Sequence, residues 1–303
     1  MLRSLFISLS QNQSLRHMME SSSLGRRISS RFVAGLHVED ALQVAAALNR
    51  QGISVTLDSL GENVASEAEA RTSAAIYHEL IDAIPERGLD ANVSVKLTQM
   101  GMDLSPALAE AIVAEMVEHA VSAKTFVRID MEGTPYTEAT IVMTERIFAN
   151  MGHVGTVLQA YLFRTAEDVE RLLRQGITMR LCKGAYKEGP ELAFPKKEDV
   201  DANYVALMKK LATSGVFCGI ATHDEKIVDE MKRFAREQKL GRDAFEFQML
   251  YGVRRDLQRA LVADGFRVRV YVPFGTEWYP YFMRRLAERP ANVLFLAKNF
   301  FRS

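Results

Sequence analysis

Two cations and a glycine stand together in the segment 178–186, TMRLCKGAY. Arg180 and Lys183 fall at the end of an apolar run typical of a strand, and Gly184 follows directly. A glycine lets the backbone approach a ligand closely, and both cations can hold phosphate oxygens. The pattern suits an anionic group such as a pyrophosphate. A surface salt bridge is the alternative for either cation taken alone.

Two adjacent arginines follow an aromatic stretch in the segment 270–292, which also holds the single tryptophan of the chain, Trp278. The planar guanidinium fork matches the two oxygens of a carboxylate, so Arg284 and Arg285 are candidates for binding one. The alternative is a solvated helix face, with Glu288 one turn after Arg284 and able to pair with it.

Polar side chains also end almost every strand that the sequence predicts. These residues are Asp58, Lys96, Asp130, Gln159, Lys183, Thr222 with His223, Gln248 and Tyr271. In a closed parallel barrel the carboxyl ends of the strands meet at one rim, where such proteins keep their active sites. The connection 186–197 contains two prolines, and we predict that it forms a lid or a binding loop.

The elements that would position these residues are short β-rich runs alternating with amphipathic helical runs. The predicted strands are 54–58, 92–97, 125–130, 154–159, 178–182, 216–220, 245–248 and 268–272; the clearest helices are 106–123, 200–212 and 224–240. Eight such units predict a (β/α)₈ barrel. An open doubly wound sheet is the alternative, but its G-x-G-x-x-G fingerprint is missing after the first strand.

Composition narrows the class of protein. Lys plus Arg and Asp plus Glu both total 38, so the formal net charge is zero and nucleic-acid binding has no general support. No apolar run approaches the roughly 18–20 residues that span a bilayer. Cys182 and Cys218 lie in apolar runs, which indicates buried thiols in a reducing compartment, and we assign them neither a redox nor a metal role.

The first residues differ from the rest of the chain. Four apolar residues recur at helical spacing: Leu2, Leu5, Phe6 and Leu9. We expect a helix that packs on the main domain or lies at a membrane interface, and an organellar transit peptide is the alternative. We place an N-terminal helical arm at 1–50 and the barrel at 51–303. The expected location is the cytoplasm, peripheral to the inner membrane face, or the mitochondrial matrix if the start is a transit peptide.

Six ordered segments together resemble the proline dehydrogenase family. They are 31–42 (RFVAGLHVEDAL), 180–186 (RLCKGAY), 193–204 (AFPKKEDVDANY), 221–224 (ATHD), 245–252 (FEFQMLYG) and 270–292 (VYVPFGTEWYPYFMRRLAERPAN). The resemblance runs from about residue 2 to residue 301. It implies a distorted (β/α)₈ barrel with additional N-terminal helices and with FAD in the barrel mouth.

The implied reaction is oxidation of L-proline to Δ1-pyrroline-5-carboxylate by hydride transfer to FAD, the first step of proline catabolism to glutamate. Electrons would then pass to a membrane quinone. The larger, bifunctional members carry a second dehydrogenase domain, for which 303 residues leave no room. The resemblance therefore implies the stand-alone form, whose product would pass to a separate pyrroline-5-carboxylate dehydrogenase.

The resemblance also implies residue roles. The proline carboxylate would be held by Lys96, Arg284 and Arg285. Tyr271 and Leu250 would pack around the proline ring, with Tyr186 close by. Asp130 would orient its neighbours, and Glu62 would pair with Arg284 across the entrance. The implied FAD contacts are Gln159, Arg180, Lys183, Gly184, Ala185, Thr222, His223, Gln248 and Glu288.

Four alternatives for individual residues or for the whole chain stay open. Lys96 could be a core lysine paired with Asp130, and His223 could be a histidine satisfied within the core. A Schiff-base lyase could use Lys96 or Lys183 as its imine-forming amine. A non-catalytic barrel that binds a membrane or a partner would explain the amphipathic start, but not the polar strand ends.

Overall fold

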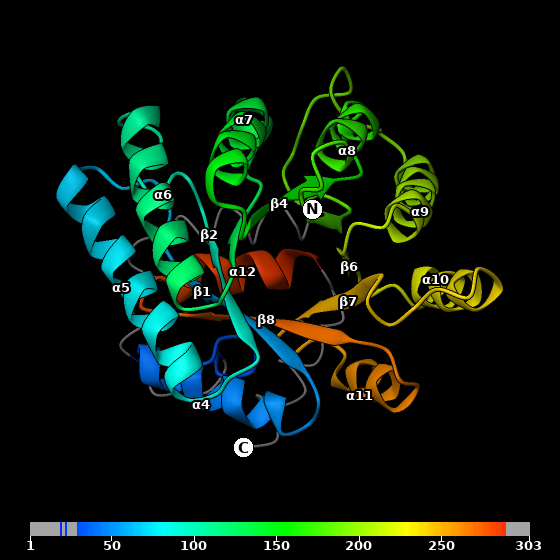
Figure 1. The fold of residues 1–303 in the computed structure, drawn as a ribbon, viewed down its shortest axis with the longest axis horizontal. Helices are drawn as coiled ribbons and strands as arrows, with labels where there is room; N and C mark the ends of the chain where they lie inside the picture. The colour runs from blue at the N-terminus through cyan, green and yellow to red at the C-terminus, as the bar shows by residue number, and fades with distance from the viewer. Residues whose placement is uncertain (1–18, 20–21, 23–28, 289–303) are drawn as a thin grey trace.

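Eight parallel strands close into a barrel in chain order, β1 to β8 (Figure 1). The computed structural model describes residues 19, 22 and 29–288, and of residues 284–288 it describes the backbone alone. The strands are β1 Ser54–Ser59, β2 Ala91–Val95, β3 Val127–Ile129, β4 Val154–Gln159, β5 Met179–Cys182, β6 Cys218–Ala221, β7 Phe245–Leu250 and β8 Val268–Phe274. The predicted (β/α)₈ barrel is therefore confirmed, with every predicted strand present and β3 shorter than expected.

One helix follows each strand. They are α5 Glu67–Glu86, α6 Pro106–Ser122, α7 Thr134–Met151, α8 Thr165–Leu173, α9 Lys197–Thr213, α10 Glu225–Glu237, α11 Arg255–Ala263 and α12 Trp278–Glu288. Local sequence explains where several begin: the side chains of Ser66 and Ser105 accept hydrogen bonds from backbone N–H groups of the first turns of α5 and α6. A glycine follows each of the helices α8, α9 and α11 in the sequence. The φ values of these glycines, +75° at Gly176, +80° at Gly215 and +85° at Gly265, are ones that glycine adopts without strain.

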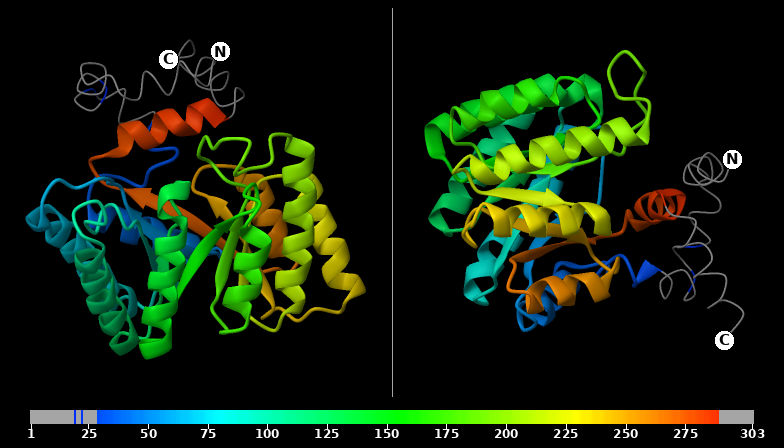
Figure 2. Two further views of the ribbon diagram at one scale, coloured as in Figure 1. Left: turned by 90° about the horizontal axis from the view of Figure 1, so that it is seen from above. Right: turned by 90° about the vertical axis from the view of Figure 1, so that its right-hand side faces the viewer.

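The helix ring departs from a regular barrel at the seam between β8 and β1. The helix α4, Val38–Asn49, precedes β1 and packs against β1, β8 and α5. The helix after β8, α12, instead lies outside the ring, beyond the carboxyl ends of the strands (Figure 2). Trp278 and Phe282 of α12 pack there with Phe32 and Leu60 in a second apolar cluster, separate from the main core.

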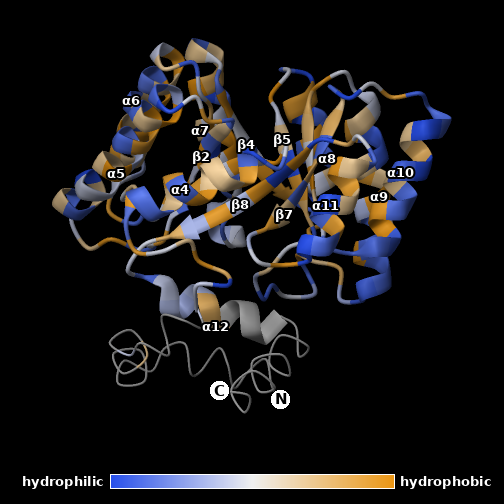
Figure 3. Cartoon of the chain, turned by 90° about the horizontal axis from the view of Figure 1, so that it is seen from below, coloured by the Kyte–Doolittle hydropathy of each residue, from blue (hydrophilic) through white to orange (hydrophobic). Residues whose placement is uncertain are grey.

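Strand residues alternate between an apolar outer layer and a polar interior. Phe245 and Phe247 of β7 point outward and pack edge-on with each other, and Phe266 joins them. The residues between and after them, Glu246 and Gln248, are buried inside the barrel. Hydrophilic positions gather on outer helices such as α9 and α10, whereas hydrophobic ones run along β8 (Figure 3). An ordinary barrel interior is filled by branched aliphatic residues, so this polar interior needs an explanation.

The predicted boundary between residues 50 and 51 stays a prediction. The apolar stripe from Leu2 to Leu9 lies outside the described residues, whereas α4, also on the N-terminal side of that boundary, packs on the barrel. Within the described part of the chain, no helix combines the length and the apolar character needed to cross a membrane.

Candidate active site

Asp130, directly after β3, joins several strands through its carboxylate. Its Oδ1 accepts hydrogen bonds from the Arg180 guanidinium at 2.9 Å and the Ser94 hydroxyl at 2.6 Å. Its Oδ2 accepts one from the Tyr271 hydroxyl at 2.7 Å. Burial, together with the charges of Asp130 and Asp58, raises the pKa of Tyr271 well above its ordinary value, so the phenol stays protonated and donates. Asp130 thereby fixes both Arg180 and Tyr271.

Lys96, directly after β2, forms a buried ion pair with Asp58 of β1. Its Nζ lies 3.0 Å from Oδ1 and 3.2 Å from Oδ2, and the side chains are 12% and 1% exposed. Burial lowers the pKa of Lys96, but the charges of Asp58 and Asp130 outweigh this and raise it above its ordinary value. Burial raises the pKa of Asp58, and the Lys96 ammonium opposes that rise. The alternative that Lys96 pairs with Asp130 is corrected, since its partner is Asp58.

Arg180 of β5 crosses the barrel interior. Its guanidinium donates from Nε to the Gln248 side-chain carbonyl and from an Nη to Asp130. It also lies over the Tyr271 ring, 5.2 Å from the centroid, at cation–π distance. Although it is only 7% exposed, Arg180 thus has charged, polar and aromatic partners at once.

Lys183 points elsewhere. Its Nζ pairs with Asp224 at 2.9 Å and with Asp201 of α9. Burial raises the pKa of both carboxyls, but the hydrogen bonds and charges of Lys183 and its neighbours together outweigh it, and each pKa is lowered. The two carboxylates also line a groove of about 560 Å³ between α9 and α10. Nearness in sequence therefore does not give Arg180 and Lys183 a common partner.

Three further rim residues are held by contacts with the backbone. Gln159 donates from Nε2 to the backbone carbonyl of Glu132 at 3.0 Å. The Thr222 hydroxyl accepts from the Asp224 backbone N–H at 3.1 Å. His223 Nε2 accepts from the Leu250 backbone N–H at 2.9 Å, so that nitrogen carries no proton. His223 is therefore tied to the end of β7, and the alternative of a histidine with a satisfied role within the fold remains open.

Gly184 stands where a side chain cannot fit. Its φ is +119°, and a Cβ there would lie 2.2 Å from the ring of Tyr161. The next two residues, Ala185 and Tyr186, are exposed. Further along the same loop, Glu188 accepts from the backbone N–H and the hydroxyl of the first residue of α7, at 3.0 and 2.6 Å. The loop after β5 is thus attached to the neighbouring turn at the rim.

The remaining predicted residues lie at the edge of the mouth. Glu62 is exposed in the loop after β1, and its charge contributes to the raised pKa of Lys96. Leu250 packs on the apolar cluster beneath α12. Arg284, Arg285 and Glu288 fall on α12, but their side chains lie outside the described part of the chain, so their roles stay predictions.

The sequence gives Asp58 a place at the rim but no role, and leaves out Ser94 and Glu246 altogether. Ser94 and Glu246 stand two residues before Lys96 and Gln248. Because side chains two apart on a strand share a face, this spacing is the signal that could have placed both inside the barrel.

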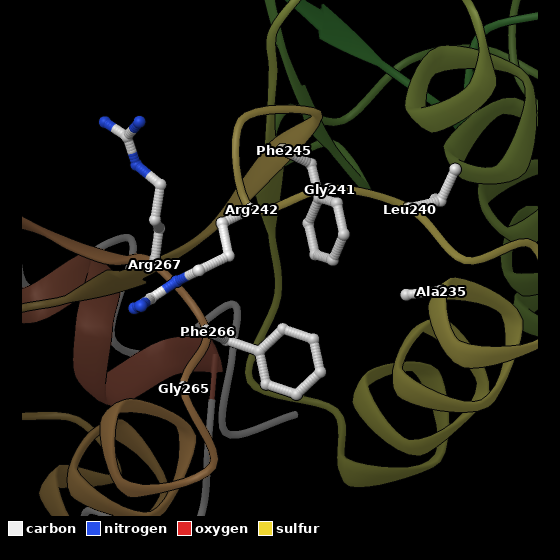
Figure 4. A pocket seen from close by; sticks show the side chains of 8 residues that line it. All are labelled: Ala235, Leu240, Gly241, Arg242, Phe245, Gly265, Phe266 and Arg267. Atoms are coloured by element: carbon white, nitrogen blue, oxygen red, sulfur yellow. The ribbon is translucent and has the colours of Figure 1, made fainter.

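A second cavity, of about 70 Å³, lies at the amino ends of β7 and β8, at the opposite end of the barrel from the rim residues. Figure 4 shows the rings of Phe245 and Phe266 beside it, whereas the side chain of Arg267 points away. Its lining contains neither a carboxylate nor a histidine. The chemistry is therefore concentrated at the opposite end.

The closed barrel and its connected, buried ionisable residues define the class of protein: a (β/α)₈ barrel of the kind used by enzymes, with its site at the carboxyl rim. The particular family follows from comparison with known proteins. The family model for proline dehydrogenase matches residues 41–298. The chain is 42% identical to proline dehydrogenase 1 of Bacillus subtilis (strain 168) over 299 residues, 98% of each chain. It is also 42% identical to proline dehydrogenase of Deinococcus radiodurans over 280 residues, 89% of each.

Bifunctional relatives are more distant. The chain is 27% identical to the bifunctional protein PutA of Escherichia coli over 316 residues, which cover 89% of this chain and 24% of that one. A solved structure of proline utilization A from Bdellovibrio bacteriovorus, inactivated by N-propargylglycine, matches with a TM-score of 0.82 at 25% identity, covering 94% of this chain and 36% of that one. The chain belongs to the proline dehydrogenase family, and the resemblance drawn from the six segments is confirmed.

Proposed function

We propose that the chain oxidises L-proline to Δ1-pyrroline-5-carboxylate by hydride transfer to FAD held at the carboxyl rim of the barrel. Family membership makes it a flavoprotein and an oxidoreductase that acts on proline. The observation that carries the finer proposal is the buried network in which Lys96 and Arg180 are paired with carboxylates at the barrel mouth.

The rim residues fit a flavin. The site offers hydrogen-bonding side chains on neighbouring strands, an arginine at β5 and a glycine whose missing side chain leaves the backbone open to close approach. We propose as FAD contacts Gln159, Arg180, Lys183, Gly184, Ala185, Thr222, His223, Gln248 and Glu288. A bound flavin supplies a two-electron acceptor, which no protein side chain can be.

The protein's own residues bind and orient the substrate. We propose that Lys96, Arg284 and Arg285 hold the proline carboxylate. Lys96 is suited to this because its raised pKa keeps it cationic at neutral pH. Cations near the substrate also repel positive charge, which favours loss of the proton from the proline ammonium, and the neutral amine can then assist hydride departure.

Asp130, Tyr271 and Leu250 complete the proposed substrate pocket. The hydrogen bond from the Tyr271 hydroxyl to Asp130 fixes the aromatic ring at the mouth, and Leu250 adds apolar surface. We further propose that Tyr186 lies close to the substrate and that Glu62 pairs with Arg284 at the entrance.

The Schiff-base alternative is disfavoured for Lys96. An imine-forming lysine must lose its proton, and such lysines have depressed pKa values. The Lys96 pKa is raised instead, and the ammonium sits on a buried carboxylate.

We propose a membrane quinone as the electron acceptor, and a separate pyrroline-5-carboxylate dehydrogenase as the consumer of the product. We further propose that the first residues of the chain contact the membrane, with the protein in the cytoplasm at the inner membrane face, or in the mitochondrial matrix if these residues are a transit peptide. Deleting residues 2–18 should then reduce liposome binding and quinone turnover while leaving proline-dependent dye reduction intact. A lower melting temperature with unchanged liposome binding would contradict this role.

Absorption spectroscopy tests the central proposal. The purified protein should be yellow, and its flavin spectrum should bleach when L-proline is added without air. The Lys96→Met variant should retain the spectrum and bleach only at much higher proline concentrations. A colourless protein that neither takes up FAD nor responds to proline would refute the proposal.

A further inference from the structure

We propose that Glu246, a buried carboxylate inside the barrel, is a positioning residue for the cofactor site. It acts by fixing the side-chain amide of Gln248, which in turn holds Arg180. This inference rests on the proposed function, because Arg180 and Gln248 are proposed flavin contacts.

A continuous series of hydrogen bonds links two arginines, Arg269 and Arg180. Arg269 Nε donates to Glu246 Oε1 at 2.7 Å. Gln248 Nε2 donates to the same Oε1, also at 2.7 Å. The Gln248 carbonyl then accepts from Arg180 Nε, and Arg180 donates to Asp130 at 2.9 Å. Glu246 and Arg269 are 1% and 8% exposed, so water cannot readily substitute for these partners.

This series of hydrogen bonds requires an acceptor between its two arginines. Arginine can only donate, and the series of hydrogen bonds has an arginine at each end. One residue between them must therefore accept on both sides, and Oε1 of Glu246 does so, while its Oε2 is buried without a hydrogen-bond partner in the described part of the chain. The Gln248 amide then has a single satisfactory orientation, with its NH₂ toward Glu246 and its carbonyl toward Arg180.

The neighbouring strand leaves space for this arrangement. Gly219 lies in β6, opposite Glu246 in the strand register. A Cβ at Gly219 would lie 2.4 Å from Gln248 Nε2 and 2.7 Å from its side-chain carbonyl carbon. Glycine inside a strand weakens it and often marks a close approach. Here the missing side chain gives room to the amide that Glu246 orients.

Glu246→Gln tests the orientation rule while keeping the shape of the side chain. The amide oxygen at position 246 can still accept from Arg269 and Gln248, but the negative charge is lost. The new NH₂ takes the place of Oε2, which has no hydrogen-bond partner among the described residues, so one buried donor is left without an acceptor. The double variant Glu246→Gln/Gln248→Glu moves the two-sided acceptor to position 248 and restores every pairing at the same net charge. Thr56→Val is the matched control. Thr56 is fully buried in the same barrel and donates to Asn92 at 2.6 Å, so its hydrogen bond does not belong to the series between Arg269 and Arg180.

The measurements are FAD titration into each apoprotein, the visible spectrum of bound flavin, and the melting temperature of the apoprotein. We expect Glu246→Gln to weaken FAD binding on the order of 10- to 100-fold, the range for one buried donor left unpaired, and to change the spectrum. Its apoprotein melting temperature should fall, and the double variant should recover it. Thr56→Val should lower the melting temperature while FAD affinity and spectrum stay as in the wild type.

Two results would count against these assignments in different ways. If the wild type binds FAD, and Glu246→Gln loses stability but keeps wild-type affinity and spectrum, Glu246 is merely structural and this inference fails alone. If the wild type binds no flavin, the proposed function fails and the positioning role fails with it.

Discussion

Ion pairs occur in two contrasting regions: inside the barrel and on the outer surface of α7 and α8. Inside, Lys96 pairs with Asp58, and their side chains are 12% and 1% exposed. On the surface, Arg171 of α8 pairs with Glu138 and Glu145 of α7, and the Arg171 and Glu138 side chains are 31% and 55% exposed. The bond lengths are similar, at 3.0 Å for Lys96–Asp58 and 2.9 Å for Arg171–Glu138.

The difference lies in what surrounds each pair. Removing two charges from water is costly, and well-packed apolar residues often stabilise a core as well or better. A barrel that needed only stability could use the aliphatic layers of ordinary barrels. Stability alone therefore does not explain the buried pairs at the rim, which the proposed function explains by binding, whereas the surface pairs add small increments of stability.

The largest expected effect comes from separating the buried pair. Asp58→Asn leaves the Lys96 ammonium without its carboxylate, which should cost about 3–5 kcal/mol of unfolding free energy. The double variant Asp58→Asn/Lys96→Met should recover much of that stability in urea unfolding, but should not recover proline binding. A double variant as unstable as Asp58→Asn would contradict this view of the pair.

Replacing Arg285 tests whether α12 belongs with the binding residues at the rim or with the solvated surface. Arg285→Met should raise the KM for proline roughly 10- to 100-fold with flavin still bound, because a lost charge-assisted contact costs about 1.5–3 kcal/mol. Steady-state kinetics measure this directly. Unchanged kinetics would place Arg285 on a solvated helix face.

A surface arginine should matter far less. Arg171→Ala should lower the unfolding free energy by roughly 1 kcal/mol or less, because exposed pairs contribute little. High salt should shrink the difference between variant and wild type. A loss as large as that of Asp58→Asn would remove the contrast between the two regions.

The smallest effect concerns a histidine pair between α5 and α6. His78 Nδ1 lies 2.8 Å from His119 Nδ1, with Asp82 and Glu115 nearby. Burial, and then the charge of His119, lowers the pKa of His78 from 6.5. The unfolded chain then binds the proton more readily, so the stabilisation is complete above about pH 6.5 and is lost as the pH falls through the folded value. Urea unfolding at pH 7.5 and 5.5 should show a larger loss in the wild type than in His78→Gln, and equal losses would contradict this prediction.

Local sequence patterns predict the barrel well. Strand alternation and glycines behind helices are properties of neighbouring residues, so Gly176 and Gly265 mark helix ends correctly. The polar strand ends also identify the rim, because all carboxyl ends of a parallel barrel must meet there.

Side-chain partners could not be predicted in the same way. Lys96 could reach either Asp58 or Asp130 from the rim, and only the interior packing selects Asp58. Lys183 and Arg180 are three residues apart, yet one meets α9 and the other crosses the barrel. That α4 takes the place of the helix after β8 depends on packing between residues far apart in sequence.

The seam between β1 and β8 has a consequence for how the protein is made. All six residues of β1 pair with β8, and Arg269 donates to the carbonyl of Val55 across a separation of 214 residues. During synthesis, β1 leaves the ribosome long before β8 exists, and its open edge must wait for almost the entire chain. Closing so long a loop is slow, and an unpaired strand edge favours aggregation. A nascent chain halted before residue 268 should therefore depend on chaperones to stay in solution.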